Sequence, residues 1–409
     1  MDTLLAVGVL LGAGLVLGET AERLGFPRVT GYILAGVLLN PSLFGLLPAA
    51  LVENADLAVN VALALITFEV GGTLAVGPLR ELGKGIVSIA VGEGQLAALV
   101  VTGGSLAVLP FVVGLPGEGL VAAYLPLALL LGALASPTDP TASLAVIHQY
   151  RARGVVSFSI MGAAAFDDAL GIINFSVAVA VAGLLAGRSV PQLSSFLYPL
   201  GLIAGSLILG AAFGLAFHLV ARLVGRESDG LLIALAVTLL ILCFGIAARL
   251  SLDQLLATMC TGAVVVNLRR NRPRIFHLIE RHVEPLVFLL FFTLSGLYLD
   301  FSVLVRYLPV VLLFVAFRTA GKLGGAYLGA SAAHAPPAMR RYTGLGLIPQ
   351  GGIVIGLALT VRNVPALIPL SDVLLSVIIG ATVIHELVGP FAAKLALQSA
   401  GEIGRRPPR

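Results

Sequence analysis

The sequence predicts an all-α polytopic membrane protein with about thirteen transmembrane helices. Of its 409 residues, 58% are hydrophobic and only 11% are charged, whereas a soluble domain carries about a quarter charged residues. Apolar segments recur along the whole chain, and most approach the ~20 residues that cross a bilayer as a helix. The first of them, Leu4–Leu17, lacks a preceding basic segment and a small-residue cleavage site, so we expect a first span instead of a signal peptide.

The predicted spans are bounded by glycines, prolines and charged residues. They cover residues 3–21, 29–41, 56–76, 84–110, 120–147, 155–186, 196–222, 230–249, 253–268, 283–299, 302–332, 343–361 and 371–398. An odd number of spans places the two ends of the chain on opposite sides of the membrane.

Basic residues are distributed unequally between the predicted loops. If the N-terminus lies outside, the outside loops hold only Arg188, Arg249, Arg306 and Arg362, whereas the inside loops hold clusters such as Arg269–Arg274. The positive-inside rule therefore predicts an outside N-terminus and a cytoplasmic C-terminus. We expect the chain to lie in the cell (inner) membrane. The same distribution accounts for the net charge of +4 without a nucleic-acid partner.

The two halves of the sequence look related, with the second copy inverted in the membrane. The matching segments lie about 210 to 230 residues apart: Val29–Val37 with Leu256–Val264, Ser136–Pro140 with Leu347–Gly352, and Asp167-Asp168 with His385-Glu386. Paired, interrupted spans in the two halves of a transporter indicate its binding site.

One predicted span carries a double proline. Pro137 and Pro140 flank Thr138 and Asp139. Proline removes a backbone donor and clashes with the preceding turn, so we expect the helix to unwind here. In a membrane, such a break must be buried in protein or line a cavity. There Asp139 neutralises a half-helix N-terminus and unpaired carbonyls face an ion. The alternative is a proline kink at which Asp139 caps a helix.

Two adjacent acids, Asp167 and Asp168, lie in the middle of the apolar run 155–186. An ionisable residue at the bilayer centre costs roughly 2.5–3.5 kcal/mol on insertion scales, so such a pair indicates an ion or proton path. Repulsion between neighbouring buried carboxylates favours keeping a proton on the pair, and the site can hold either a proton or a cation. The alternative is a structural ion pair between helices.

Two cations, Arg318 and Lys322, lie four residues apart and therefore on one helical face. We expect Lys322 to pair with Asp167, and Arg318 with Glu93 or Glu386. A buried lysine changes protonation readily and an arginine does not. Lys322 is therefore a candidate proton carrier and Arg318 a fixed counter-charge. The alternative is that both cations only hold the helices together.

Other polar residues in the predicted spans are expected to be structural. Glu93 lies between two glycines, where helices approach closely, and Glu386 follows His385. We expect His385 to be a core histidine bonded to a carbonyl. Glu69 lies near the end of its span, where we expect it to be solvated. No histidine shows metal-ligand spacing, and we expect no cofactor.

Five segments together resemble the motifs of the monovalent cation/proton antiporter superfamily, in particular its two-aspartate sodium/proton branch. They are Gly31–Ser42, Thr138–Pro140, Phe166–Asp168, Gly321-Lys322 and Gly346–Gly352. The resemblance covers nearly the whole chain, and the motifs are specific jointly.

The resemblance implies a fold with inverted repeats and two crossing discontinuous helices. It also implies the domains: a dimerisation bundle of residues 1–83 and 229–301, a core transport bundle of 84–187 and 302–398, a linker helix within 188–228 and a short cytoplasmic tail of 399–409. In this family, an elevator-like movement of the core gives alternating access, and the chain is expected to form a homodimer.

The resemblance also implies roles for individual residues. The second acid of the family binds the cation, which puts Asp168 in that role, with Thr138 and Asp139 lining the site for a transported Na+ or Li+. The first acid pairs with the lysine, which puts Asp167 with Lys322. Two acids and a titratable lysine favour two protons per cation, and hence electrogenic exchange that responds to the membrane potential.

Alternatives remain open at the level of the sequence. Thr-Asp-Pro is more typical of the electroneutral branch, which usually has asparagine where this chain has Asp167 and often a hydroxyl residue where it has Ala164. A potassium/proton exchanger of the same fold, electroneutral sodium/proton exchange and a gated ion channel are the other transport hypotheses. An intramembrane aspartyl protease is disfavoured because the Gly-x-Gly-Asp motif is absent, so we expect no enzyme.

Overall fold

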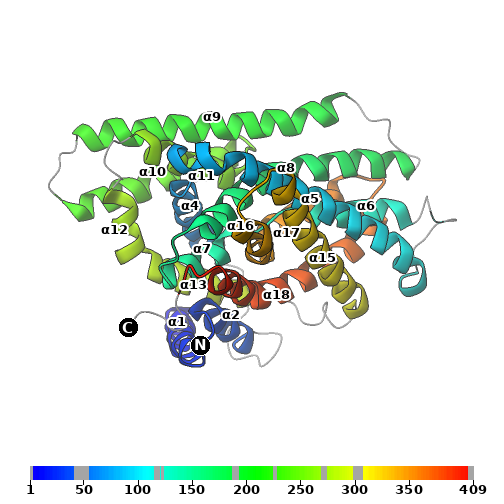
Figure 1. Ribbon diagram of the computed structural model, residues 1–409, viewed down its shortest axis with the longest axis horizontal. Helices are drawn as coiled ribbons and strands as arrows, with labels where there is room; N and C mark the ends of the chain where they lie inside the picture. The colour runs from blue at the N-terminus through cyan, green and yellow to red at the C-terminus, as the bar shows by residue number, and fades with distance from the viewer. Residues whose placement is uncertain are drawn as a thin grey trace. The chain divides into compact units, whose positions relative to one another are not determined.

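The computed structural model describes residues 3–40, 55–114, 120, 124–186, 193–223, 228–268, 274–297 and 307–403, and their regular secondary structure is entirely helical. Seven helices in these ranges are long and apolar enough to cross a membrane. They are α1 (Thr3–Arg23), α5 (Val76–Val112), α8 (Val155–Leu185), α9 (Leu193–Leu223), α10 (Asp229–Arg249), α15 (Leu308–Ala332) and α18 (Ile368–Ser399) (Figure 1).

The remaining helices are shorter. They are α2 (Arg28–Leu38), α4 (Asp56–Gly72), α6 (Leu125–Leu134), α7 (Pro140–Gln149), α11 (Gln254–Leu268), α12 (Arg274–His282), α13 (Glu284–Leu297), α16 (Pro337–Tyr342), η2 (Thr343–Leu347), α17 (Gly352–Thr360) and η3 (Val361–Asn363).

The all-helical fold class is confirmed, and each predicted span coincides with a helix or with a pair of half-helices. The number of membrane crossings stays a prediction. Helix α12 was not expected, because Arg274–His282 lies in a predicted loop. Its Ile275, Leu278 and Ile279 are buried, and their spacing of three and four residues is that of an amphipathic helix.

Several expectations fall partly outside the described residues. These are Pro41 and Ser42 of the early motif, the beginning of the span 302–332, the end of the span 283–299, the last six residues of the tail, and the loop residues Arg188, Arg269, Arg270, Arg272 and Arg306.

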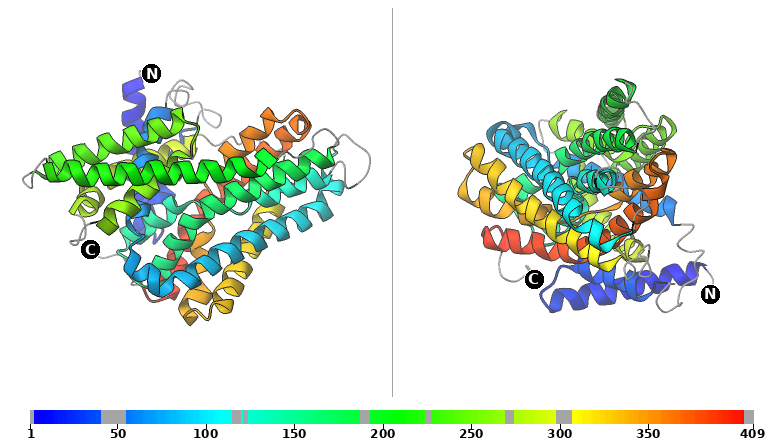
Figure 2. Two further views of the ribbon diagram at one scale, coloured as in Figure 1. Left: turned by 90° about the horizontal axis from the view of Figure 1, so that it is seen from above. Right: turned by 90° about the vertical axis from the view of Figure 1, so that its right-hand side faces the viewer.

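The chain divides into two compact units. The first comprises Met1–Gly83, Leu144–Arg151 and Gly201–Tyr298. Within it, α1 and α2 lie side by side in every view (Figures 1 and 2). Gly36 of α2 and Gly296 of α13 meet backbone to backbone, which leaves no room for a side chain at either position. A separate apolar cluster joins α4, α9, α10, α11 and α12.

The second unit comprises Lys84–Ser143, Ala152–Leu200 and Leu299–Arg409. Its apolar core is built by side chains of α5, α6, α8, α15, α17 and α18. Helices α5 and α15 run side by side in both views of Figure 2. Glycines allow this close approach, because a Cβ at Gly325 would lie 2.5 Å from the Cα of Glu93. Both predicted discontinuous helices begin in this unit.

The first discontinuity separates α6 from α7, and the second separates η2 from α17. Helix α6 ends at Leu134, and helix α7 starts at Pro140, where a missing N–H is harmless in the first turn. Helix α17 starts at Gly352 after the extended residue Gly351. The prolines and glycines therefore unwind the chain where the sequence predicts it.

Candidate functional site

The two breaks are hydrogen-bonded to each other. The main-chain N–H of Asp139 donates to the carbonyl of Pro349 at 3.0 Å. In the other direction, the side-chain amide of Gln350 donates to the carbonyl of Leu134 at 2.8 Å. The hydroxyl of Ser143 also donates to the carbonyl of Gly346 at 2.7 Å. The breaks therefore satisfy part of each other's exposed backbone, as buried irregular chain requires.

Arg318 of α15 supplies further donors to both breaks. Its guanidinium donates to Ala135 at 3.1 Å and Pro137 at 2.7 Å in the first break. It donates to Ile348 at 2.6 Å and Pro349 at 3.4 Å in the second. All four acceptors are main-chain carbonyls, and Arg318 is fully buried. The planar fork of the guanidinium reaches acceptors in several directions at once, so Arg318 holds the two breaks together.

Lys322, one turn further along α15, is also fully buried. Its ammonium donates to Glu93 Oε2 at 2.5 Å, to the carbonyl of Ser136 at 2.7 Å and to Thr138 Oγ1 at 2.7 Å. An ammonium group has three donors, and these contacts use all of them. The expected pairing of Lys322 with Asp167 is present, but it is longer, at 3.4 Å.

The hydroxyl of Thr138 connects the lysine with the acids of α8. It donates to Asp167 Oδ2 at 2.5 Å while it accepts from Lys322. Asp167 is fully buried and Asp168 is 4% exposed. Among the described residues, Asp167 Oδ1 and Glu93 Oε1 have no hydrogen-bond partner. Two buried carboxylates thus share one lysine, and each keeps one free acceptor.

Asp139 caps helix α7. Its carboxylate accepts from the main-chain N–H and from the hydroxyl of Thr141, both at 2.8 Å. This is the usual N-cap arrangement, in which a side chain satisfies an N–H of the first turn. The capping role expected as the alternative is therefore present. It neutralises the positive end of a half-helix that starts inside the site.

The comparison with protein families decides the identity of the chain. A model described as "Sodium/hydrogen exchanger, transmembrane" matches residues 8–398. The chain belongs to this family.

The curated proteins that resemble the chain include two with long matches, at 26% and 28% identity. The high-affinity Na(+)/H(+) antiporter NhaS3 of Synechocystis is 26% identical, over 93% of this chain and 87% of the relative. The glutathione-regulated potassium-efflux system protein KefC of Salmonella paratyphi B is 28% identical, over 85% of this chain and 53% of the relative. Other curated Na(+)/H(+) antiporters are matched over 43 to 53% of their own length, so the chain spans about half the length of these relatives.

A solved structure supports the same fold. The sodium proton antiporter MjNhaP1 from Methanocaldococcus jannaschii superimposes with a TM-score of 0.75 at 21% identity, and the match covers 100% of both chains. At this identity the likeness shows the fold alone. It agrees with the family assignment.

Three expectations about polar residues of the family member are wrong. Arg318 was expected to pair with Glu93 or Glu386, but its hydrogen bonds go to main-chain carbonyls, and Glu93 pairs with Lys322. His385 is buried, but neither ring nitrogen has a hydrogen-bond partner among the described residues. Its ring lies edge-on to Phe314 at 6.4 Å. Glu69 is 5% exposed and not solvated. Glu386 is buried on α18 as expected.

Sequence reasoning missed two contributors to the site. Gln350 and Ser143 were not singled out, although both bond across the breaks. Gln350 lies inside the Gly346–Gly352 motif, so its position next to a break was a usable signal. Ser143 lies one turn after Pro140, where a helical hydroxyl shows no pattern of its own.

Proposed function

We propose that the chain is a secondary antiporter that exchanges protons for a monovalent cation, Na+ or Li+, across a cell membrane. The observation that carries this is the pair of buried acids, Glu93 and Asp167, which share a single lysine beside two mutually bonded helix breaks. With both acids ionised, one lysine cannot neutralise them. A bound proton or cation offsets the difference, and the two compete.

Asp168 is proposed as the residue that binds the cation, with Thr138 and Asp139 as further oxygen ligands. Carboxylate, hydroxyl and unwound-backbone oxygens suit an alkali cation, which exchanges its water shell for such groups. In this arrangement Asp139 keeps its capping bond to Thr141 while it contributes charge to the site.

Asp167 and Lys322 are proposed to carry the coupled protons. Thr138 lies between them and bonds to both, so a proton lost by the ammonium has a direct route to the carboxylate. Glu93 then anchors the lysine from the other side. The acids Asp167 and Asp168 together with the titratable Lys322 favour two protons per cation, which makes the exchange electrogenic. Arg318 stays charged throughout and keeps the breaks joined.

The proposed domain roles and the proposed movement follow from the resemblance to the antiporter family. The second unit contains the site and is proposed to be the moving core (84–187 and 302–398). The first unit is proposed to hold the dimerisation bundle (1–83 and 229–301), with 188–228 as linker. The chain is proposed to work as a homodimer in an inner membrane, with its C-terminus in the cytoplasm, and to serve pH homeostasis. An elevator-like movement of the core gives alternating access.

The alternative is potassium/proton exchange, which the likeness to a potassium-efflux protein favours. Electroneutral sodium/proton exchange is the second alternative, favoured by Thr138-Asp139-Pro140. Proton flux distinguishes these three hypotheses when it is measured with a pH-sensitive dye in liposomes that contain the purified protein. Sodium, lithium and potassium are added in turn, with and without an imposed membrane potential.

Release of protons by sodium or lithium, at a rate that follows the potential, is the expected result. A response to potassium alone supports the first alternative, and a rate independent of potential supports the second. Asp168→Asn abolishes exchange, whereas Asp372→Asn, at an exposed acid paired with Arg362, leaves it unchanged. Wild-type exchange by Asp168→Asn contradicts the site assignment, and no response to any cation contradicts antiport itself.

A further inference from the structure

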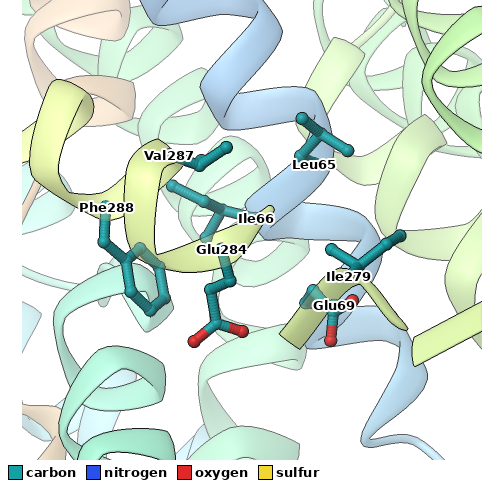
Figure 3. A pocket seen from close by; sticks show the side chains of 7 residues that line it. All are labelled: Leu65, Ile66, Glu69, Ile279, Glu284, Val287 and Phe288. Carbon is teal, nitrogen blue, oxygen red and sulfur yellow. The ribbon is translucent and has the colours of Figure 1, made fainter. Parts of the chain in front are cut away.

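A second group of titratable residues lies in the first unit. Figure 3 shows a pocket in which Glu69 of α4 and Glu284 of α13 lie among the apolar side chains Leu65, Ile66, Ile279, Val287 and Phe288 (Figure 3). Both carboxylates point to the same side of the pocket, away from Val287. None of these residues belongs to the unit that contains the proposed exchange site.

The two acids differ in their partners. Glu284 Oε2 lies 2.7 Å from Nδ1 of His148, the penultimate residue of α7. Glu69 is 5% exposed, and its Oε1 has no hydrogen-bond partner among the described residues. Glu284 therefore has a side-chain partner, whereas Glu69 has a carboxylate oxygen without a hydrogen-bond donor.

The charges around Glu69 do not compensate for this. Within the described part of the chain, the charged groups that act on Glu69 are Glu284 and Glu280, and the same two acids act on His148. Glu280 lies on α12 and also approaches His277, at 3.8 Å. An ionised Glu69 would be a buried anion whose Oε1 has no donor, next to like charges, which is unfavourable. A proton on Glu69 removes this cost.

The walls of the pocket favour a proton over a metal cation as the ligand. An alkali cation needs a shell of several oxygens in place of its water. Apart from the two carboxylates, every side chain that lines the pocket is hydrocarbon. A proton needs only one carboxylate oxygen.

We propose that Glu69, Glu284 and His148 form a second proton-binding site, in which Glu69 holds a proton at neutral pH while Glu284 is paired with His148. This proton is separate from those exchanged at the Asp167-Asp168 site and does not depend on the proposed transport function. By the charge distribution of the loops, the ends of α4, α7 and α13 that carry the three residues lie toward the cytoplasm.

The direct test is infrared spectroscopy of the purified protein at pH 7, which detects a protonated, buried carboxyl group. Glu69→Gln is expected to remove one such absorption, and Glu81→Gln, at an exposed acid of α5, to remove none. An unchanged spectrum in Glu69→Gln overturns the proposal. A spectrum that loses the absorption only in variants of Glu93 or Asp167 overturns it as well.

Thermal unfolding gives an independent readout. A proton that is bound in the folded chain and released on unfolding makes the folded state less stable as the pH rises. The Tm of Glu69→Gln minus that of the wild type is therefore expected to increase from pH 6 to pH 8, and a flat difference contradicts the proposal. Because the proposal makes the native side chain neutral, Glu69→Gln and Glu69→Leu must fold. Failure of both variants to fold also overturns it.

Discussion

Replacement of Arg318 by glutamine tests how the two breaks are held together. In the native chain, the guanidinium donates to four main-chain carbonyls, three of them within 3.1 Å. A hydrogen bond to a charged donor contributes about 1.5–3 kcal/mol. The three shorter bonds therefore contribute about 4.5 kcal/mol at the lower value. Glutamine is neutral and can keep at most two of them, as hydrogen bonds of about 0.5–1 kcal/mol each, so we expect a destabilisation of about 3 kcal/mol.

The assay is thermal unfolding of the detergent-solubilised protein, read as an apparent Tm. At about 2 °C per kcal/mol, the lower end of the range for large domains, Arg318→Gln lowers the Tm by roughly 6 °C. Arg318→Lys keeps the charge but loses the planar guanidinium, and we expect its Tm to lie between those of the wild type and Arg318→Gln. The matched control is Arg362→Gln, because Arg362 pairs with Asp372 at an exposed site and such pairs contribute about 0–1 kcal/mol. If Arg318→Gln melts within 2 °C of this control, the carbonyl bonds do not stabilise the breaks.

Two further substitutions test the positions of α8 and α15. Glu402 accepts hydrogen bonds from the N–H groups of Val156 and Ser157, at 2.6 and 2.8 Å, and so caps α8, the helix of the adjacent aspartates. Glu402→Ala is expected to lower the free energy of unfolding by about 1–2 kcal/mol in a denaturant titration. An unchanged midpoint of the unfolding transition contradicts the cap. The Tm of Gly325→Ala is expected to lie below that of Gly324→Ala. A Cβ at Gly325 would meet the backbone at 2.3 to 2.7 Å, whereas one at Gly324 would meet only the end of a leucine side chain at 3.3 Å. Equal melting temperatures of the two variants contradict this packing.

The discontinuous helices were predictable because their cause is local. Pro137 and Pro140 exclude a continuous helix whatever surrounds them, and the structure has a break there. The second break follows from Pro349 and the glycines after it. The contact between Asp167 and Lys322 was also predictable, since two unlike charges buried in one small bundle have few other partners.

The partners of Arg318 were not predictable, because sequence reasoning pairs charges with charges. A helix break releases carbonyl groups that the sequence does not display, and these outnumber the available acids. The burial of Glu69 was not predictable for a similar reason. Its place near a span end indicated water, but α12, formed by an unexpected amphipathic segment, contributes Ile279 to the pocket that buries it. Burial of a residue depends on neighbours from other parts of the chain, so it cannot be read from position along a span.

The order of the two cations on α15 follows from their chemistry. Arg318 lies where carbonyls of both breaks diverge, and a planar group with five donors can meet acceptors in different directions. Lys322 lies one turn away, where Glu93, Ser136 and Thr138 converge on a single point. A compact ammonium with three donors fits that convergence, and it is the one of the two that can lose its proton. If the two residues were exchanged, the arginine would bring a permanent charge to the acids and the lysine would leave carbonyls of the breaks unsatisfied. The sequence therefore places the fixed charge where structure must persist and the removable charge where the acids are.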